Sequence, residues 1–321
     1  MRAGVASLDG VVIKDVDPPK PKPTDILVRI KAVALNRADL GSARGDTSHG
    51  ASTGMPIGSE YAGEVVEAGS EVRDFKPGDR VMCHSPGSHA EMAVSDYGRA
   101  MKIPDAMSFE QAATLPIGLN TLHNALVTAG RLKAGETVMV QGASSGVGII
   151  GLQIAKLMGA KFVVGTSTNE ARRARLKEFG ADLAVSTKDA DWPEQVLKAT
   201  DGKGLNLTVD MLSGPTVSQT MRCTALLGRI VNIGRLAGMK AEFDFDLHAR
   251  QRIDYIGVTF RTRTVEEVRE ILVRMRTDLW DDVKAGRIRV PIDKTFPLAE
   301  ARVGHEHMRA NKHFGKILLI P

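Results

Sequence analysis

The chain has 321 residues, 43% of them hydrophobic, which allows a packed core in each of two domains of ordinary size. Only two cysteines are present, Cys83 and Cys223, which excludes a disulfide framework and indicates a reducing compartment. The formal net charge is +5, but 43 basic residues are scattered among 38 acidic ones, so we expect no nucleic-acid partner. The N-terminal residues do not form a signal-peptide pattern, and the most apolar helical segment, Ile149 to Met158, is too short to cross a bilayer. We therefore expect a cytoplasmic protein that does not bind a membrane.

Residues 1–118 have the pattern of a small β-barrel. The stretch "DILVRIKAVAL" alternates as a half-buried strand does, and "YAGEVVEAGSEV" followed by "FKPGDRVM" indicates strand, turn and strand. Pro77, Gly78 and Asp79 supply the chemistry of the turn. Short strands separated by glycine and proline are typical of such a barrel.

Residues 119–257 have a different pattern, in which apolar strands alternate with helical segments. The predicted strands are "TVMVQG", "KFVVGT", "LNLTVDM", "RIVNIG" and "DYIGVTF", and one predicted helix covers Val147 to Met158. This alternation indicates a parallel sheet with helices on both faces, and therefore an α/β fold.

The remaining residues, 258–321, contain a predicted helix from Val265 to Ala285, the stretch "PIDKTFPL", a second short helix and the strand "GKILLI". They are too few for a third domain, so we predict that they return to complete the first one. The predicted domains are therefore 1–118 together with 258–321, and 119–257.

The stretch "GASSGVG", which begins at Gly142, fits two motifs at once. Its first five residues match G-x-S-x-G, the nucleophile elbow of a hydrolase, with Ser144 as the nucleophile. A hydrolase would also need an acid and then a histidine downstream, for which the candidates are Asp210 and then His305, His307 or His313.

A dinucleotide-binding loop explains every glycine of the same stretch. Gly142 makes the tight turn, Gly146 lets the backbone approach a pyrophosphate, and Gly148 lets the following helix pack against the strand. The N-terminus of that helix points unpaired N–H groups at the anion. A hydrolase elbow does not need the third glycine, so we favour the dinucleotide loop over the elbow and over a turn without a ligand. Ser144 is then not a nucleophile.

The spacing G-x-x-x-G-x-G also occurs in short-chain dehydrogenases, which carry it near the N-terminus and need a Tyr-x-x-x-Lys pair. Here the loop lies in the middle of the chain. None of Tyr61, Tyr97 and Tyr255 has a lysine four residues on, which excludes that family.

Six stretches follow one another along the whole chain: "ALNRADL" (34–40), "GSEYAGEVVEAGSEVRDFKPGDRV" (58–81), "QGASSGVG" (141–148), "GVTFRTRT" (257–264), "FPLAEA" (296–301) and "ANKHFGKILL" (310–319). In content and order they resemble the medium-chain dehydrogenase/reductase superfamily, specifically its zinc-free quinone oxidoreductase branch. The resemblance implies a GroES-like barrel, built from the N-terminal segment and the C-terminus, with a Rossmann domain between them. It also implies NADPH as the cofactor.

The resemblance implies a set of cofactor-binding residues. Those of the loop are Gly142, Ala143, Ser144, Ser145, Gly146, Val147 and Gly148. Those outside the loop are Ser167, Thr168, Arg172, Thr187, Ile233, Gly234, Val258, Thr259, Phe260 and Asn311.

NADPH rather than NADH is expected from the end of the second strand of this domain. An NAD site places an acid there, whereas this chain has small uncharged residues from Gly165 to Thr168. Ser167 with Glu170 fits a capping box, so we expect the next helix to start at this point with Glu170 tied to the cap. In the resembling reductases a basic residue near the position of Arg172 holds the 2′-phosphate, and we favour Arg172 over Arg173.

The resemblance places Asn36 and Thr121 at the wall of a substrate cleft. Asn36 would donate a hydrogen bond to the substrate oxygen or the ribose, and Thr121 would pack against the nicotinamide. The alternatives are a loop-stabilising asparagine and a helix-surface threonine. Many family members carry a tyrosine where this chain has Thr47, and the absence of that tyrosine favours a quinone over an acyl thioester.

His123 stands at a position that is often aromatic in the family. We interpret His123 as a packed helix residue rather than a replacement proton donor.

A catalytic zinc is not expected. Zinc-dependent relatives carry a cysteine where this chain has Asn36 and a His-Glu pair where it has Ser59 and Glu60, so both the Cys and the His ligand are replaced. Two further groups of possible ligands are interpreted as ordinary polar residues of the surface or a rim: Cys83, His84 and His89, and the pair His305 and His307.

Without a metal to stabilise an alkoxide, a conjugated acceptor is a better match than an alcohol. We therefore expect NADPH-dependent hydride transfer to a quinone or enone, without zinc. The alternatives are a non-catalytic NADPH-binding protein of the crystallin-like or RNA-binding kind, and an enoyl-thioester reductase of the same family. The resemblance also implies a homodimer that pairs edge strands, here Asp254 to Phe260.

Overall fold

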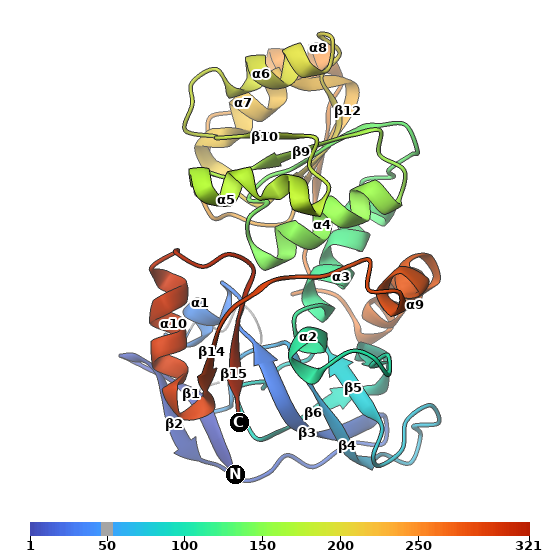
Figure 1. Cartoon of the computed structure of the whole chain (residues 1–321), viewed down its shortest axis with the longest axis vertical. Helices are drawn as coiled ribbons and strands as arrows, with labels where there is room; N and C mark the ends of the chain where they lie inside the picture. Colours follow the sequence, from blue (N-terminus) through green and yellow to red (C-terminus); the bar gives the residue numbers. More distant parts are fainter. Residues whose placement is uncertain (46–53) are drawn as a thin grey trace. The chain divides into compact units, whose positions relative to one another are not determined.

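The computed structural model describes residues 1–45 and 54–321, and Thr47 lies outside the described residues. The chain divides into two compact units, and Figure 1 traces its course through them. Unit 1 consists of Met1–Ile117, Arg261–Arg276 and Arg289–Pro321. Unit 2 consists of Gly118–Phe260 and Thr277–Ile288. The domain limits expected from the sequence stay a prediction.

Unit 1 is built on a largely antiparallel sheet with the strand order β14-β15-β3-β4-β5-β7, in which β6 also pairs with β3. The strands are β3 (Asp25–Ala34), β4 (Tyr61–Ala68), β5 (Arg80–Cys83), β6 (Met92–Asp96), β7 (Ala100–Lys102), β14 (Ile292–Pro297) and β15 (Lys316–Ile320). The last strand, β15, runs antiparallel to β3 with Leu318 opposite Ala34. Strands from both ends of the chain therefore share one sheet.

The other elements of unit 1 are short. An antiparallel ribbon is formed by β1 (Arg2–Ser7) and β2 (Gly10–Asp15). The helices are α1 (Asp39–Ser42), α2 (Phe109–Ala113) and α10 (Ala301–Arg309), with single 3₁₀ turns at Tyr97–Arg99 and Leu298–Glu300. The long helix α9 (Val265–Lys284) is divided between the two units after Arg276.

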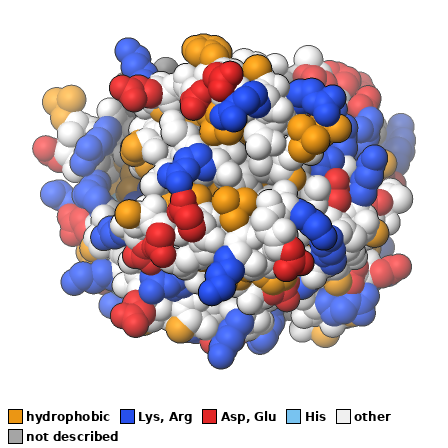
Figure 2. Space-filling model, turned by 90° about the horizontal axis from the view of Figure 1, so that it is seen from above, with side chains coloured by type: hydrophobic (Ala, Val, Ile, Leu, Met, Phe, Trp, Pro, Cys, Tyr) orange, Lys and Arg blue, Asp and Glu red, His pale blue; other side chains and the backbone are white. Residues whose placement is uncertain are grey.

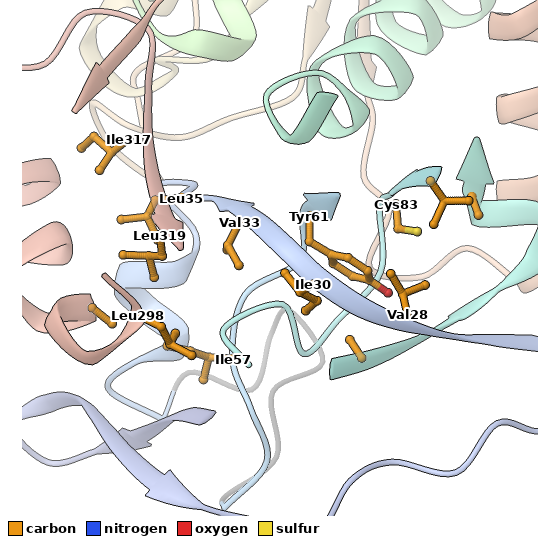
Figure 3. Packing of buried hydrophobic residues seen from close by; sticks show 14 of the residues in the cluster. Val28, Ile30, Val33, Leu35, Ile57, Tyr61, Cys83, Leu298, Ile317 and Leu319 are labelled. Atoms are coloured by element: carbon orange, nitrogen blue, oxygen red, sulfur yellow. The ribbon is translucent and has the colours of Figure 1, made fainter. Parts of the chain in front are cut away.

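Unit 1 has a buried hydrophobic core, part of which is shown in Figure 3. Its members come from strands that are distant in sequence, because β3 is flanked by β4 on one side and by β15 on the other. The residues labelled in Figure 3 are Val28, Ile30, Val33, Leu35, Ile57, Tyr61, Cys83, Leu298, Ile317 and Leu319. Burying such side chains contributes about 1.5–3 kcal/mol each, so this core fixes the relative positions of the three strands.

Unit 2 contains a parallel sheet with the strand order β10-β9-β8-β11-β12-β13. The strands are β8 (Thr137–Val140), β9 (Phe162–Thr166), β10 (Leu183–Val185), β11 (Leu205–Asp210), β12 (Thr224–Asn232) and β13 (Asp254–Gly257). The chain passes from β8 outward to β9 and β10, and then returns to the other side of β8 to form β11. Strand order therefore reverses between β8 and β11, and ligands of such sheets bind at this switch point.

The helices of unit 2 connect these strands. They are α3 (Pro116–His123), which begins in unit 1, α4 (Gly146–Leu157), α5 (Glu170–Ala174), α6 (Trp192–Ala199), α7 (Val217–Arg222) and α8 (Phe245–Gln251). Shorter turns are a π-helical one at Asn124–Ala129 and 3₁₀ turns at Leu176–Phe179 and Gly214–Thr216.

The α/β fold class predicted from the sequence is confirmed, and most element limits agree within one residue. The predicted helices 147–158 and 265–285 are observed as α4 and α9. The predicted strand 254–260 is too long, since β13 ends at Gly257. The strand β10 was not predicted, because it is only three residues long and two of them are half-buried.

Two surface properties follow from the sequence composition. Lysine and arginine side chains are mixed with aspartate and glutamate on the face that Figure 2 shows. Within residues 1–45 and 54–321, the structure contains no helix with both the length and the apolar character needed to cross a membrane.

Candidate functional site

The candidate cofactor residues of unit 2 gather at one edge of its sheet. Because all neighbouring strands are parallel, their carboxyl ends meet at the same edge. The loop 142–148 follows β8, Ser167 and Thr168 follow β9, and Thr187 follows β10. On the other side of β8, the pair 233–234 follows β12 and the run 258–260 follows β13. The structure thus brings together residues that are spread over more than a hundred positions of the sequence.

The start of the glycine-rich loop is fastened to the end of β9. Gly142 has a φ of +67°, a left-handed conformation that glycine adopts without a steric penalty. Its N–H donates to Thr166 Oγ1 at 3.0 Å, and the N–H of Ala143 donates to the Thr166 carbonyl at 2.9 Å. The tight turn predicted at Gly142 is therefore present, and the loop is held in register with the neighbouring strand.

Ser145 caps the helix that follows the loop. Its hydroxyl accepts the Gly148 N–H at 3.0 Å and donates to the Gly142 carbonyl at 3.0 Å, so the loop closes on itself. A Cβ at Gly148 would lie 2.7 Å from both Ala143 Cα and the Gly142 oxygen. The loop and the first turn of α4 are therefore in backbone contact, which only glycine permits. The N-terminus of α4 presents N–H groups suited to a phosphate anion.

Ser144 contacts a second hydroxyl rather than a base. Its Oγ accepts a hydrogen bond from Ser167 Oγ at 3.0 Å. A nucleophilic serine needs a neighbouring general base that removes its proton, and a neutral hydroxyl cannot do this. The geometry agrees with a lining residue of the loop and not with a hydrolase elbow.

The segment after β9 differs from the prediction in one respect. The N-cap of α5 is Asn169, whose side chain accepts the Arg172 N–H at 2.9 Å, so the predicted capping box at Ser167 is wrong. The hydroxyl of Ser167 instead donates to Ser144 Oγ, and Ser167 does not cap α5. Glu170 does lie in the first turn of α5, as predicted. Arg173 Nη1 donates to the Ser167 carbonyl at 3.2 Å, which ties this arginine to the loop.

A polar network that the sequence reasoning missed shapes the carboxyl ends of β11 and β12. Asp210 Oδ1 accepts the N–H groups of Leu212 and Ser213, each at 2.8 Å. Burial raises the pKa of Asp210, and these hydrogen bonds oppose that effect. Ser213 has a φ of +55° and donates to the Gly234 carbonyl at 2.8 Å, while Asn232 donates to Ser213 Oγ. From the sequence, Asp210 was considered only as the acid of a hydrolase. Its position at the carboxyl end of a strand is the signal that could have indicated this role.

Backbone hydrogen bonds connect this network to the predicted cofactor residues that follow β12 and β13. The N–H groups of Ile233 and Gly234 donate to the Asp210 carbonyl at 2.9 and 3.2 Å. The N–H of Val258 donates to the Asn232 carbonyl at 2.9 Å. Backbone bonds across strand ends thus hold these segments at the same edge as the glycine-rich loop.

In unit 1, Asn36 is tied into a buried charged cluster. Its amide Nδ2 donates to Glu60 Oε2 at 2.9 Å and to the Ala34 carbonyl at 3.3 Å. Lys316 Nζ donates to Asn36 Oδ1 at 2.7 Å and also to Glu60 Oε2. The second carboxylate oxygen of Glu60 accepts the Ile117 N–H at 2.7 Å in the first turn of α3. Neither Lys316 nor Glu60 was identified from the sequence as part of the site.

Asp39 adds a second carboxyl group to this cluster. It is buried, and its Oδ2 accepts the backbone N–H of Asn36 at 2.7 Å. Burial raises the pKa of Asp39 to about 7, although this hydrogen bond and the charge of Lys316 act in the opposite direction. The cluster therefore contains a carboxyl group that titrates near neutral pH.

Three other predicted residues have clear positions. Thr121 is a half-buried residue of α3 in unit 2, whereas Asn36 belongs to unit 1. His123 is buried at the end of α3 with its Nε2 atom 2.7 Å from Asp278 Oδ2, which confirms it as a packed helix residue. Asn311 has a left-handed φ of +53°, and its Oδ1 accepts a hydrogen bond from Arg37 at 2.9 Å.

The interpretation of Cys83, His89 and His305 as surface or rim residues is wrong, because all three are buried. Burial raises the pKa of the Cys83 thiol to about 12, which keeps the sulfur protonated. His89 Nε2 lies 3.0 Å from His305 Nε2, whereas His307 Nε2 lies 2.8 Å from Asp293 Oδ2. His305 and His307 therefore contact different partners. Among the residues that the structure describes, no three His, Cys, Asp or Glu side chains are grouped so that they could hold a metal ion.

Two sequence families match the chain. The family described as "Alcohol dehydrogenase GroES-like domain" matches residues 22–105, and the family described as "Zinc-binding dehydrogenase" matches residues 146–276. Asn36 and Ser59, the positions compared above with zinc ligands, lie in the range matched by the GroES-like family and not in the range matched by the zinc-binding dehydrogenase family.

Individual proteins resemble the chain over most of its length. A quinone oxidoreductase of Pseudomonas aeruginosa is 30% identical over 316 residues, which cover 96% of this chain and 94% of that protein. A highly reducing polyketide synthase of Cryptosporiopsis sp. is 30% identical over 302 residues, which cover 92% of this chain but 12% of that protein. Among solved structures, a mycobacterial protein complexed with NADPH has a TM-score of 0.89 and 25% identity, with 100% of both chains covered.

Proposed function

Because the chain belongs to the medium-chain dehydrogenase/reductase superfamily, in its quinone oxidoreductase branch, we propose that it transfers hydride from NADPH to a quinone or another conjugated carbonyl compound. The observation that carries this proposal is the loop 142–148, which lies at the switch point of the parallel sheet and leads into the N-terminus of α4. The structural likeness to a protein complexed with NADPH supports the same cofactor.

The residues of the loop fit a dinucleotide. Gly142 takes the left-handed conformation of the turn, a side chain at Gly148 would collide with the backbone of the loop, and the N–H groups at the start of α4 suit a pyrophosphate. Ser144, Ser145 and Val147 would line the same anion. Once bound, NADPH supplies the hydride, and the protein contributes binding, orientation and exclusion of water.

Asn36 and Thr121 are proposed to contact the reacting groups, and Arg172 is proposed to hold the 2′-phosphate of NADPH. The remaining residues are also proposed to contact the cofactor. They are Ser167, Thr168, Thr187, Ile233, Gly234, Val258, Thr259, Phe260 and, from unit 1, Asn311.

A conjugated acceptor suits a site without zinc. When hydride reaches an electron-poor carbon of a quinone, the negative charge delocalises onto oxygen, and hydrogen-bond donors in a dry site can stabilise it. An alcohol substrate would need a group that stabilises an alkoxide, which a metal ordinarily provides. The replacement of both the Cys and the His ligand by Asn36 and Ser59 supports the zinc-independent reading.

Enoyl-thioester reduction is the second candidate, because the chain matches a segment of a highly reducing polyketide synthase at the same identity as the quinone oxidoreductase. A steady-state assay of NADPH oxidation separates the candidates. We expect turnover with simple quinones to exceed turnover with a crotonyl thioester at least tenfold. A preference for the thioester would favour the second candidate. NADPH binding without turnover of either substrate would favour a non-catalytic, crystallin-like or RNA-binding protein.

A homodimer is proposed from the free edge of the sheet in unit 2. The strand β13 is the last in the strand order, and its Tyr255 is exposed. Two copies of β13 could pair edge to edge, which would satisfy their unpaired backbone groups. Light scattering at micromolar concentration should give the mass of two chains. A monomer under these conditions would contradict the proposal.

A further inference from the structure

A buried charge pair lies directly beside the amide of Asn36. Lys316 Nζ donates to Asn36 Oδ1 at 2.7 Å and also to Glu60 Oε2, while Asn36 Nδ2 donates to the same carboxylate oxygen at 2.9 Å. Lys316 is 3% exposed and Glu60 is fully buried. Each of the three side chains therefore contacts the other two.

Sheet pairing brings these residues together. Lys316 opens β15, Glu60 immediately precedes β4, and Asn36 follows shortly after β3, the strand between the other two. The pairing continues beyond the strand ends, since the Leu35 N–H donates to the Ile317 carbonyl at 2.9 Å. The backbone of three neighbouring strands thus fixes the position of the charge pair relative to Asn36.

The charges determine which way the Asn36 amide faces. An ammonium group only donates hydrogen bonds and a carboxylate only accepts them. With the amide reversed, its NH2 group would face Lys316 and its oxygen would face Glu60, so both contacts would be repulsive. The observed orientation engages both N–H groups, one with Glu60 and one with the Ala34 carbonyl at 3.3 Å. After the bond from Lys316, one lone pair of Oδ1 remains available.

We propose that Lys316 is a positioning residue that holds Asn36 with its amide oxygen available, so that Asn36 accepts a hydrogen bond from a hydroxyl or carboxamide N–H group of the cofactor or substrate. This inference rests on the proposed function and refines the role of Asn36. A donor to the developing oxyanion of a quinone would need a free N–H group, and both N–H groups of Asn36 are already engaged.

An exchange of the two side chains tests whether Asn36 acts as an acceptor. The variant N36D/E60Q keeps the net charge and keeps an acceptor at position 36, whereas N36A removes the polar group. The NADPH Kd and the kcat/KM for a quinone should worsen about two- to tenfold in N36A, since one hydrogen bond is lost, and should worsen less in N36D/E60Q. An exchange variant as impaired as N36A would show that a donor is required and would overturn the proposal.

A double-mutant comparison tests whether Lys316 acts through Asn36. K316M alone leaves Glu60 buried without a counter-charge and can fail to fold, so the neutral pair K316M/E60Q is used as well. The two substitutions together should lower kcat/KM and NADPH affinity about two- to tenfold in the wild-type background and hardly at all in the N36A background. Equal losses in the two backgrounds would show a purely structural role. The matched control is K102M, which removes an exposed lysine paired with Asp79 in the same unit.

A spectroscopic readout is independent of turnover. The chain contains seven asparagines, so selective ¹⁵N labelling gives few side-chain amide signals, and the signal of Asn36 is the one lost in N36A. Because Glu60 bonds to this amide directly, the signal in K316M/E60Q is compared with that in E60Q, and the two should differ. In K316R the signal should stay near the wild-type position, since the guanidinium can donate to the same oxygens. Equal signals in K316M/E60Q and E60Q would overturn the positioning role. If the wild type reduces no quinone, the proposed function fails, while the amide signal and NADPH binding still decide the role of Lys316.

Discussion

His89 and His305 form a buried pair in unit 1, with their Nε2 atoms 3.0 Å apart and their rings nearly perpendicular. Two neutral imidazoles can share this contact only if one donates and the other accepts. His89 Nδ1 lies 3.3 Å from Ser88 Oγ, so a proton on Nδ1 leaves Nε2 of His89 free to accept from His305. Protonation of the pair would set two donors against each other in an apolar interior.

The first prediction is that acid destabilises the protein through this pair. Burial lowers the pKa of His305 to about 4 and that of His89 well below its usual range, whereas the unfolded residues titrate near 6.5. Between about pH 6.5 and 4 the unfolded chain therefore binds protons that the folded chain does not bind, and stability falls as the pH falls. Each histidine contributes up to about 1.4 kcal/mol per pH unit. Above about pH 7.5 both states are nearly neutral at these residues and their contribution to the slope becomes small.

Denaturant unfolding of wild type and H305Q between pH 4.5 and 8 checks this prediction. The slope of the unfolding free energy against pH should be smaller in H305Q below pH 6.5, and nearly equal in the two proteins above about pH 7.5. The substitution also changes the packing around position 305, which alters the unfolding free energy by the same amount at every pH. This amount does not affect the slope, so the slope is the quantity compared. Equal slopes below pH 6.5 would show that the pair does not control acid stability.

How far the sequence predicts this molecule depends on how local the determining interactions are. The loop 142–148 and α4 follow from glycine spacing and helical periodicity, both of which lie within one stretch of chain. The cap of α5 was wrongly assigned because Ser167 had a second partner, Ser144, from another strand end. The cluster of Lys316, Glu60 and Asn36 could not be found in this way, since its members are as many as 280 positions apart and meet only when β15 pairs with β3.

The second prediction concerns Gly148→Ala. In an ordinary helix interior this change stabilises by about 1 kcal/mol. Here the new Cβ would lie 2.7 Å from backbone atoms of the loop, and such overpacking costs about 1–3 kcal/mol. We expect a lower melting temperature and at least about a tenfold weaker NADPH affinity as the loop is displaced from the N-terminus of α4.

The matched control is Gly151→Ala on the same helix. Its Cβ would meet the end of the Leu122 side chain at 2.7 Å, and this flexible group can move aside. Calorimetry and NADPH titration should therefore show a smaller loss in G151A than in G148A. If G148A binds NADPH as well as G151A does, the close contact between loop and helix has no role in cofactor binding.

The third prediction is that Ser144→Ala has a small effect. The change removes the contact with Ser167 and at most one neutral hydrogen bond to NADPH, which is worth about 0.5–1.5 kcal/mol, so NADPH affinity should fall at most roughly two- to tenfold. Wild-type protein should not react with a fluorophosphonate probe. Labelling of Ser144 by that probe would restore the hydrolase interpretation.

The fourth prediction is specificity for NADPH through Arg172. A charge-assisted contact with the 2′-phosphate is worth about 1.5–3 kcal/mol, so R172A should raise the KM for NADPH about ten- to a hundredfold and leave NADH kinetics almost unchanged. R173A serves as the control, because Arg173 bonds to the Ser167 carbonyl and should affect both cofactors alike. If wild type uses both cofactors equally, or if R172A impairs both alike, Arg172 does not read the phosphate.

The last prediction is that the protein works without zinc. A zinc site needs deprotonated thiolate, neutral histidine or carboxylate ligands. At the position where zinc-dependent relatives have a cysteine, this chain has Asn36, and Asn36 is in contact with the ammonium group of Lys316, which would repel a divalent cation. The thiol of the nearest cysteine in sequence, Cys83, is buried and has a pKa of about 12. Metal analysis of purified protein should therefore find less than one zinc per chain, and chelators should leave NADPH oxidation unchanged. One tightly bound zinc per chain, with activity lost on chelation, would require a ligand set that this arrangement of Asn36, Glu60 and Lys316 does not provide.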